Sequence, residues 1–403
     1  MRILIHTMYF LPEFGSAPIL MNELAASLAA RGHEVEVMTT LPRSPRGRKY
    51  AGRFLLRETR SGFVARRVLT NSTHHHFGRL AAWSIYTLYT IARLGRAHRG
   101  DVVFLRLPPL QLGVTGILAR YLRGARVMLN VQDIHPDLSI ESGLLRNRLA
   151  IKAALAFERW IYARHKTIVV ISDGFKKNLV AKGVSASKIA VLPNWVDTDF
   201  LQPLPKDNPV SEKLGLARKF VLMYSGTISI SSYETLVRIL DAAALLKDDP
   251  DIMIALVGEG FKAAELKAEA ARRDLPNVAF FPFQPYPDLP RMLAGADVLL
   301  VPLDKEMSLL SVPSKLYNFM AAGRPILGLA HRDSEVFQIL GAAGCGRCAP
   351  PDDPAGIAAE IRRMKKDAQA LAAMGAAGRA YALANVARDR VLRSFEDLMR
   401  SMP

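Results

Sequence analysis

Short apolar runs alternate with helix-length segments through both halves of this chain, and that alternation restricts the possible folds more than any other feature. In the first half the apolar runs are Ile3–His6, Val35–Met38, Val102–Leu105, Val127–Val131 and Thr167–Ile171. The segment Leu20–Ala30 has helical periodicity and lies between the first two runs. Strands that alternate with helices form parallel sheets covered on both faces, so the pattern predicts an α/β domain.

The second half repeats the same alternation of apolar runs and helix-length segments. Its apolar runs are Phe220–Gly226, Ile252–Val257, Val278–Phe281, Val298–Val301 and Ile326–Leu329. A chain of 403 residues, half of them hydrophobic, is too long for one core and predicts two domains. The stretch Leu192–Pro203, which leads into two further prolines, has no periodicity and is the best linker. We therefore expect Rossmann-like, doubly wound domains at 1–195 and 210–385, a linker at 196–209, and a cleft between the domains.

The stretch Val301–Leu327 carries the strongest local signal for a ligand. It predicts a strand, a loop, a helix over 315–322 with Ser314 as its N-cap, and a second strand. A helix N-terminus offers free amide groups and the positive end of a dipole, which suits a phosphate. Lys315 adds a positive charge in the first turn, where a cation is unfavourable unless an anion is bound. A solvated lysine on an ordinary crossover is the alternative.

The charge of the chain is concentrated in its first half. Residues 1–200 carry 29 Lys and Arg against 13 Asp and Glu, a net charge of +16, whereas residues 201–403 carry 25 against 24, a net charge of +1. The first half therefore faces an anionic partner, which is a membrane, nucleic acid or a phosphorylated substrate. The strand and helix pattern fails between Leu41 and Arg67, where basic residues crowd together: Arg43, Arg46, Arg48, Lys49, Arg53, Arg57, Arg60, Arg66 and Arg67. We expect this basic loop to hold an acceptor diphosphate.

The segment 74–94 is an apolar, helix-length stretch. Its large apolar side chains are Leu80, Trp83, Tyr86, Leu88, Tyr89 and Ile91. It is too short and too interrupted to span a bilayer, but it suits a helix lying in the membrane interface with arginines at its ends. A core helix of the first domain is an equal alternative. Three consecutive histidines, 74–76, point in different directions on a strand or helix, so we expect no metal site there.

Neither a targeting segment nor a membrane span is expected. The chain begins directly with a strand pattern, and no window offers about 18 uninterrupted apolar residues. With only two cysteines, these features predict a cytoplasmic chain. The pair Cys345 and Cys348 is half a zinc site without a second pair, and small buried residues are the better interpretation. The motif Asp197-Thr198-Asp199 lies in the linker, and we interpret it as structural rather than metal-binding.

Asp133 follows a strong strand and is therefore expected at a sheet edge that binds ligands. A carboxylate there could orient or deprotonate an acceptor hydroxyl, and His135 is the other candidate for this role. A loop carboxylate that caps a local turn is the alternative. Glu141 and His33 are exposed candidates with weaker placement.

Several short motifs occur together in one order along nearly the whole chain. They are Pro12–Ala17, Arg31–Val35, Leu192–Asp197, Tyr224–Gly226, Val257–Gly260, Ala296–Val298, Pro313–Lys315 and Ala321–Ile326. In this order the chain resembles the family 4 retaining glycosyltransferases of the GT-B fold. The resemblance is to the bacterial branch that builds exopolysaccharides, O-antigens and colanic acid.

The resemblance implies transfer of a sugar from a nucleotide-diphosphate donor with retention at the anomeric carbon, without a metal or another cofactor. The diphosphate would lie against the amides of 314–316 and near Gly226, with Lys315 neutralising the leaving group. The base would lie near Gly258 and Phe283, and the ribose near Asn318. The implied donor-binding residues are Gly15, Ser16, Gly226, Thr227, Gly258, Glu259, Gly260, Phe283, Pro313, Ser314, Lys315, Leu316 and Asn318. A C-terminal helix at about 386–403 would pack back on the first domain.

Three positions depart from the pattern of many relatives. Many relatives carry two glutamates that flank seven residues; here the first would fall at Leu310, and the second on the helix that holds Asn318. The loop 226–232 carries no cation where many relatives have an Arg and a Lys. Lys315 is therefore expected to supply more of the positive charge that neutralises the diphosphate. Gln132 and Asp133 stand where a His-Asp pair is common.

The sequence thus predicts a retaining, metal-independent glycosyltransferase that adds one sugar to a lipid-diphosphate-linked glycan. It would work in the cytoplasm, peripherally bound to the anionic inner face of the bacterial membrane. A nucleotide-sugar epimerase of the same fold is one alternative, for which only Asp133 and Glu259 offer carboxylates in the cleft. A nucleic-acid-binding protein using the basic half is another, but its arginines are not interleaved with a stacking platform.

Overall fold

The computed structural model describes residues 1–13, 15–42, 50, 52–70, 76–141, 143–303 and 312–403, and it comprises two compact units. Unit 1 contains Met1–Asn194 together with Val391–Pro403, and unit 2 contains Trp195–Arg390. Each unit is built on one β-sheet covered by helices on both faces. The two expected α/β sheets are therefore confirmed.

The sheet of unit 1 has eight strands in the order β3-β4-β2-β1-β5-β6-β7-β8. Their bounds are β1 (Arg2–His6), β2 (Glu34–Thr40), β3 (Leu55–Arg60), β4 (Phe63–Val68), β5 (Val102–Leu107), β6 (Arg126–Val131), β7 (Thr167–Val170) and β8 (Ile189–Val191). All neighbours are parallel except β3 and β4. Ile5 of the central strand is in register with Val37 and Phe104, and all three are fully buried, as parallel strands between two helical layers require.

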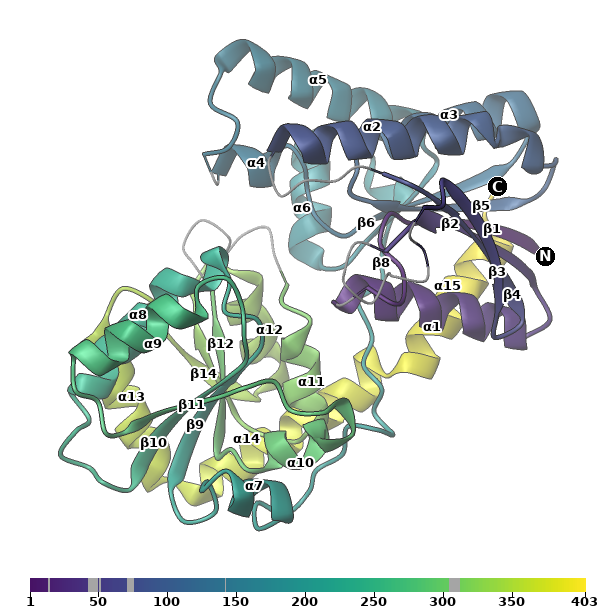
Figure 1. Ribbon diagram of the computed structural model, residues 1–403. Helices are drawn as coiled ribbons and strands as arrows, with labels where there is room; N and C mark the ends of the chain where they lie inside the picture. Colours follow the sequence, from purple (N-terminus) through teal and green to yellow (C-terminus); the bar gives the residue numbers. More distant parts are fainter. Residues whose placement is uncertain (14, 43–49, 51, 71–75, 142, 304–311) are drawn as a thin grey trace. The chain divides into compact units, whose positions relative to one another are not determined.

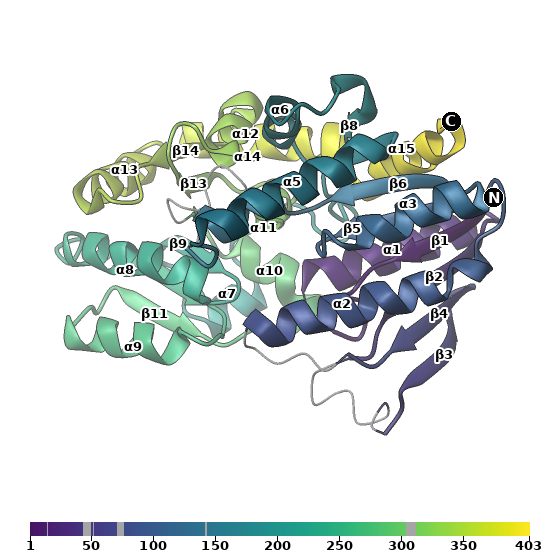
Figure 2. The ribbon, with the colours of Figure 1, turned by 90° about the horizontal axis from the view of Figure 1, so that it is seen from above.

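Helices cover both faces of this sheet (Figure 1). On one face lie α2 (His76–Ala92), α3 (Leu112–Arg123) and α5 (Arg148–Arg164), and on the other lie α1 (Ser16–Ala30) and α15 (Arg388–Ser401). The end of α15 is held by buried contacts, since Glu396 pairs with His33 at 2.9 Å and the ring of Phe395 meets that of Phe104 at 6.0 Å. Figure 2 shows both chain ends on the same side of unit 1, where Arg126 donates to the carbonyl of Met399 at 3.2 Å.

The basic segment 41–67 is not the irregular loop that the sequence predicted. Its second part forms the antiparallel pair β3 and β4, and β4 also pairs with β2. Arg66 donates to Glu36 at 2.8 Å, and the fully buried Arg67 pairs with Glu58 at 2.6 Å. These two guanidinium groups serve the fold, so their expected role in holding a diphosphate is wrong. Arg43, Arg46, Arg48 and Lys49 lie outside the described residues.

Helix α2 is a core helix on one side and an exposed apolar helix on the other. Tyr86 is fully buried and donates to the carbonyl of Met38 at 2.7 Å, while Trp83 is also buried. By contrast, Leu80 is 51% and Leu88 is 65% exposed. The core interpretation of this segment is therefore confirmed for one face. His74 and His75 lie outside the described residues, and so does the side chain of His76. No helix in the described ranges is both long enough and apolar enough to cross a membrane.

Unit 2 has a six-stranded parallel sheet in the order β11-β10-β9-β12-β13-β14. Its strands are β9 (Phe220–Ser225), β10 (Ile252–Val257), β11 (Val278–Phe281), β12 (Val298–Pro302), β13 (Ile326–Leu329) and β14 (Gly346–Ala349). Helices α8 (Ile230–Ala244), α9 (Ala263–Arg272) and α13 (Pro354–Lys366) lie on one face (Figure 1). Helices α10 (Leu289–Ala294), α11 (Lys315–Ala321) and α12 (Glu335–Ala343) lie on the other. The core between strands and the first set contains Leu222, Leu240, Leu256 and Ile361.

The segment 196–209 lies within unit 2. The ring of Phe200 stacks on that of Tyr286 at a centroid distance of 4.6 Å, and Leu201 is buried. Asp197 accepts hydrogen bonds from the amides of Asp199 and Phe200, at 3.1 and 3.0 Å, and forms an ion pair with Arg388. The first carboxylate of the Asp-Thr-Asp motif is therefore engaged in a structural turn.

Candidate active site

The loop after β9 and the start of α11 meet at the point in unit 2 where the strand order reverses, between β9 and β12. Ligands of open α/β sheets bind outside the carboxyl ends of the strands at such a point. Gly226 directly follows β9, and Lys315 begins α11 after β12. A Cβ atom on Gly226 would lie 2.7 Å from the Lys315 ammonium, so the lysine reaches across to the neighbouring strand end. The fold therefore brings together two residues that are 89 positions apart and were both predicted to contact a diphosphate.

The ammonium of Lys315 lies 4.1 Å from the centroid of the Tyr224 ring, which is a cation–π contact. Within the described ranges, no carboxylate forms an ion pair with it. Desolvation by burial lowers the pKa of Lys315 from 10.5 to about 7. An anion placed beside this group would restore its charged form and offset the cost of burial. The site can therefore bind an anionic ligand at the end of β9.

Glycines allow the loops after β9 and β10 to pack directly on each other. Gly258 has φ 153°, and a Cβ there would lie 1.9 Å from the carbonyl oxygen of Gly226. The amide of Gly226 donates to the carbonyl of Val257 at 3.0 Å, and that of Ile228 donates to Glu259 at 2.9 Å. Because side chains are absent from this contact, a ligand can approach the backbone closely.

The start of α11 differs in detail from the prediction. Ser314 occupies the N-cap position as predicted, but its side chain makes no capping hydrogen bond. The amide of Leu316 donates to the carbonyl of Pro313 at 3.0 Å and is already engaged. Asn318 lies one turn further on and is half-buried. Leu310 lies outside the described residues.

The other predicted donor-binding residues of unit 2 lie along the same carboxyl edge. Thr227 and Glu259 are exposed in the loops after β9 and β10, Gly260 follows Glu259, and Phe283 follows β11 with 49% of its surface exposed. His331, which the sequence analysis missed, follows β13, and its buried Nε2 atom has no hydrogen-bond partner among the described residues. The sequence signal that could have identified His331 was its position just after the predicted strand Ile326–Leu329.

In unit 1 the strand order reverses between β1 and β5. Gly15 and Ser16 are exposed at the start of α1, after β1, so the structure assigns them to a different unit from the other predicted donor-binding residues. Asp133 and His135 follow β6, and the Nδ1 atom of His135 is 3.1 Å from the hydroxyl of Ser139. Burial lowers the pKa of His135, while the charge of Asp133 acts in the opposite direction.

Three buried polar residues missed by the sequence analysis lie at the carboxyl ends of these strands. They are His6 at the end of β1, Arg106 in β5 and Asn130 in β6. In the described part of the chain, both ring nitrogens of His6, the Nε of Arg106 and the Nδ2 of Asn130 lack hydrogen-bond partners. Desolvation lowers the pKa of His6 to about 4 and also lowers that of Arg106, which the charge of Asp133 opposes. The sequence signal for this site was Arg106 within an apolar strand. It was missed because the predicted strand, Val102–Leu105, ended one residue before it.

Two alternatives for an acceptor-side base occupy other positions. His33 is only 7% exposed, and its ring nitrogens lie 2.9 Å from Glu396 and 3.2 Å from the chain's amino group. It precedes β2 and therefore lies at the amino edge of the sheet, so the expectation that it is exposed is wrong. Glu141 is exposed at the end of α4 (Asp137–Glu141).

The described residues contain no group of three or more His, Cys, Asp or Glu side chains arranged to hold a metal ion. Cys345 and Cys348 are free thiols, and burial raises the pKa of each to about 12. Thiols with so high a pKa are poor nucleophiles, which agrees with their interpretation as small packing residues.

Comparisons with known proteins bear on the family and the fold of the chain. A glycosyl transferase 4-like domain matches residues 17–195, and the family of glycosyl transferases group 1 matches residues 210–381. WcaI of Escherichia coli (strain K12), described as a colanic acid biosynthesis glycosyl transferase, is 28% identical over 412 residues, which cover 98% of each chain. WbjE of Pseudomonas aeruginosa, described as a glycosyltransferase, is 29% identical over 273 residues, 67% of this chain and 68% of that protein. HepE of Anabaena, solved in complex with UDP, has a TM-score of 0.75 at 16% identity over 100% of both chains, a likeness of fold. The chain therefore belongs to the family 4 glycosyltransferases and has the GT-B fold.

Proposed function

We propose that this chain is a retaining glycosyltransferase that moves a sugar from a nucleotide-diphosphate donor to a lipid-diphosphate-linked glycan during bacterial surface polysaccharide biosynthesis. The observation that carries the proposal is the desolvated ammonium of Lys315, which has no anionic partner among the described residues and lies at the strand-order reversal of unit 2. The name of the relative WcaI, which refers to colanic acid, supports the polymer class. Complexes of HepE with UDP and with UDP-glucose support a nucleotide sugar as donor.

The proposed chemistry uses fixed positive charge. Negative charge develops on the leaving diphosphate as the glycosidic bond breaks, and Lys315 is placed to stabilise that charge in a desolvated site. The glycine loops at Gly226 and Gly258 let the phosphates approach the backbone. Since the lysine supplies the compensating charge, we propose that no metal is required, and we expect turnover to survive treatment with EDTA.

On the acceptor side, Asp133 is the proposed group that orients or deprotonates the attacking hydroxyl. The buried Arg106 lies close enough for its charge to interact with that of Asp133. His135, whose pKa is lowered by burial, would be neutral at physiological pH and able to donate or accept a hydrogen bond.

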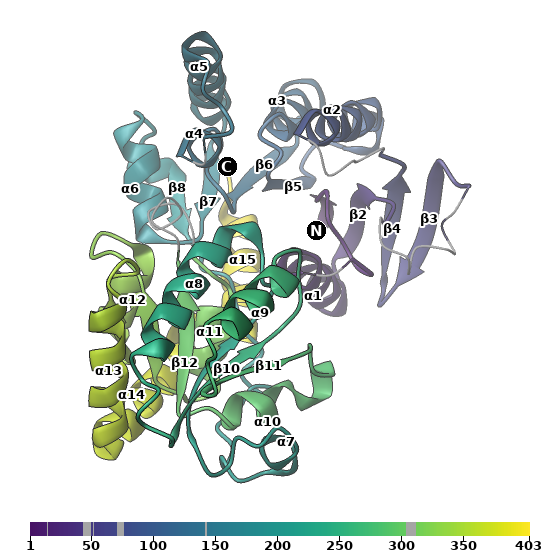
Figure 3. The same ribbon diagram turned by 60° about the vertical axis from the view of Figure 1, so that its left-hand side comes forward.

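We further propose that unit 1 binds the membrane surface peripherally through α2 and α5. Leu149 is 77% exposed on α5, Trp160 is partly exposed on the same helix, and Leu80 and Leu88 are exposed on α2. Exposed cations accompany them on α5: Arg148, Lys152, Arg159 and Arg164. Figure 3 shows α5 standing out from the sheet of unit 1. Apolar side chains flanked by basic ones suit an interface with anionic lipid.

A panel of nucleotide sugars tests the donor assignment. The true donor should raise the unfolding temperature, because it binds only the folded state, and then support transfer to lipid-linked glycan detected by mass spectrometry. Incubation with the donor alone should leave the sugar attached to its nucleotide. Release of an epimerised sugar in that control would favour an epimerase and overturn the proposal.

Co-sedimentation with vesicles tests the membrane assignment. The chain should bind anionic vesicles at low salt, and Leu149→Glu should weaken that binding. Leu245→Glu is the matched control, because Leu245 is an exposed leucine of unit 2, 48% accessible, and should leave binding unchanged. Equal binding of both variants and the unmodified chain would remove α5 from the proposed surface.

A further inference from the structure

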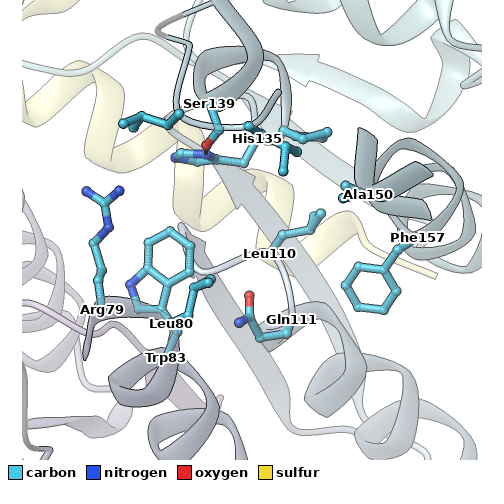
Figure 4. A pocket seen from close by; sticks show the side chains of 13 residues that line it. Arg79, Leu80, Trp83, Leu110, Gln111, His135, Ser139, Ala150 and Phe157 are labelled. Atoms are coloured by element: carbon cyan, nitrogen blue, oxygen red, sulfur yellow. Dashed lines mark hydrogen bonds between the residues drawn. The ribbon is translucent and has the colours of Figure 1, made fainter. Parts of the chain in front are cut away.

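A cavity of about 390 Å³ lies within unit 1, on the side of the sheet covered by α2 and α5 (Figure 4). Its walls come from the first turns of α2, the loop after β5, residues 135–139 and 144–145, and α5 from Ala150 to Phe157. The volume falls in the range of about 300–1,000 Å³ that is typical of small-molecule sites. The proposed donor site lies in unit 2 and does not account for this cavity.

The cavity is apolar over most of its wall and polar at one side. Leu80 and Trp83 of α2 and Ala154 and Phe157 of α5 supply apolar surface. Figure 4 shows Arg79, Trp83 and His135 at one side of the cavity and Phe157 at the other. A ligand that fits this distribution has a long apolar part and a polar group at one end.

The polar side holds a guanidinium and an imidazole, and the charges of Asp133 and Asp137 also act on that imidazole. The guanidinium of Arg79 lies 5.6 Å from the centroid of the Trp83 ring, and the imidazole of His135 lies 5.7 Å from the same ring. His135 also contacts the hydroxyl of Ser139, so the polar groups of the cavity are held together at the carboxyl edge of β6. An anionic head group is the complement of this end, because Arg79 offers planar, charged donors suited to a phosphate.

Apolar surface continues from the cavity to the outside. Leu144 lines the cavity and is 51% exposed, and Leu149 is exposed at the start of α5. An alkyl chain bound in the cavity can therefore extend over Leu144 to the surface.

We propose that this cavity binds one alkyl chain of a lipid phosphate, with the phosphate at Arg79 and His135 and the chain between α2 and α5. This inference rests on the proposed function, because it takes the lipid of the acceptor as the molecule that occupies the cavity. It places the head group near Asp133, two residues before His135, where the acceptor hydroxyl is proposed to react. The apolar chain would contribute affinity, and the charged end would set its direction in the cavity.

Direct binding of alkyl phosphates tests this assignment without any nucleotide sugar. Isothermal titration with hexyl, octyl and decyl phosphate, each below its micelle concentration, should show affinity rising about fourfold for each methylene that enters the cavity. Ala154→Trp should fill the cavity and weaken decyl phosphate binding at least about tenfold. The matched control Ala153→Trp, an exposed alanine on the same helix that does not line the cavity, should leave binding unchanged.

The head group is tested with decanol and with Arg79→Gln. Decyl phosphate should bind more tightly than decanol, and Arg79→Gln should reduce that preference. Non-saturable binding, equal affinity of Ala154→Trp and the unmodified chain, or equal affinity for decanol and decyl phosphate would each overturn the proposal. Because these measurements need no donor, a failure of sugar transfer with intact alkyl phosphate binding would count against the proposed function alone.

Discussion

The Lys315 ammonium lies over the ring of Tyr224, 4.1 Å from its centroid. Tyr224 lies near the end of β9 and Lys315 begins α11, which follows β12, so the two side chains come from either side of the strand-order reversal in unit 2. Tyr224 is fully buried, and its hydroxyl donates to the carbonyl of Thr227 at 2.6 Å, which fixes the ring below the glycine loop. The aromatic face partly compensates the desolvated ammonium but provides no full negative charge. An anionic ligand would complete the electrostatics of this pair.

Removal of the Lys315 amine should reduce turnover with little effect on folding. We expect Lys315→Ala to lower kcat/KM by about 100- to 1,000-fold, the usual effect of losing one fixed group that stabilises transition-state charge. Lys365→Ala is the control, because Lys365 pairs with Asp249 at 2.6 Å and belongs to no site. Steady-state kinetics with the donor found in the panel would measure both. Unchanged kinetics in Lys315→Ala would mean that the diphosphate binds elsewhere.

Donor binding should take up a proton at mildly alkaline pH. Burial holds the pKa of Lys315 at about 7 in the free protein, so at pH 8 the amine is mostly neutral, and a bound diphosphate would raise its pKa. The donor found in the panel is the right ligand, because its diphosphate diester has no group that titrates near neutral pH. Titrations of this donor in buffers of different ionisation enthalpy should give an uptake approaching about one proton at pH 8 and little at pH 6. Lys315→Met should abolish the difference between the two pH values. An uptake that is the same in Lys315→Met would assign the proton to another group.

The glycine contact between the loops after β9 and β10 should be intolerant of any side chain. Gly258→Ala places a Cβ 1.9 Å from the carbonyl oxygen of Gly226 at a φ of 153°, so the loops must separate. We expect a loss of about 1–3 kcal/mol in stability and weaker UDP binding. Gly341→Ala is the control, since it lies in α12 with no atom within 4 Å of the added carbon, and it should be neutral or stabilising by up to about 1 kcal/mol. Thermal unfolding and UDP titration of Gly258→Ala and Gly341→Ala would measure the changes in stability and in UDP affinity.

The docking of α15 on unit 1 should depend on pH through Glu396. Hydrogen bonds from Arg31 and Arg400, followed by that from His33, hold the pKa of Glu396 at about 2, below its ordinary 4.5. A lowered carboxyl pKa stabilises the folded state above the unfolded value, and this stabilisation disappears as the pH falls from about 4.5 toward 2. Glu396→Gln should therefore unfold at a lower temperature than the unmodified chain at pH 7, with the difference shrinking below pH 4.5. Asp397→Asn, at the exposed neighbouring position, should behave like the unmodified chain at both pH values.

Local sequence pattern predicted most of the strands because burial between two helical layers requires continuous apolar runs, and these can be read directly. The runs at Ile3–His6 and Ile252–Val257 became β1 and β10 with almost unchanged bounds. The hairpin β3–β4 was missed because its arginines suggested a solvated loop. The burial of Arg67 depends on Glu58 and on the carbonyl of Thr40, which lies 27 residues away in the sequence.

The sequence by itself determined the fold class, the family resemblance and the position of a lysine in the first turn after a strand, because these depend on residue type and spacing along the chain. Only the tertiary structure decided which cations are already paired and which polar groups are left without partners. Arg66 and Arg67 meet carboxylates inside unit 1, whereas Lys315 meets an aromatic ring in unit 2. The reason is that the charge state and binding capacity of a side chain depend on neighbours brought close by folding, and spacing along the chain does not specify them.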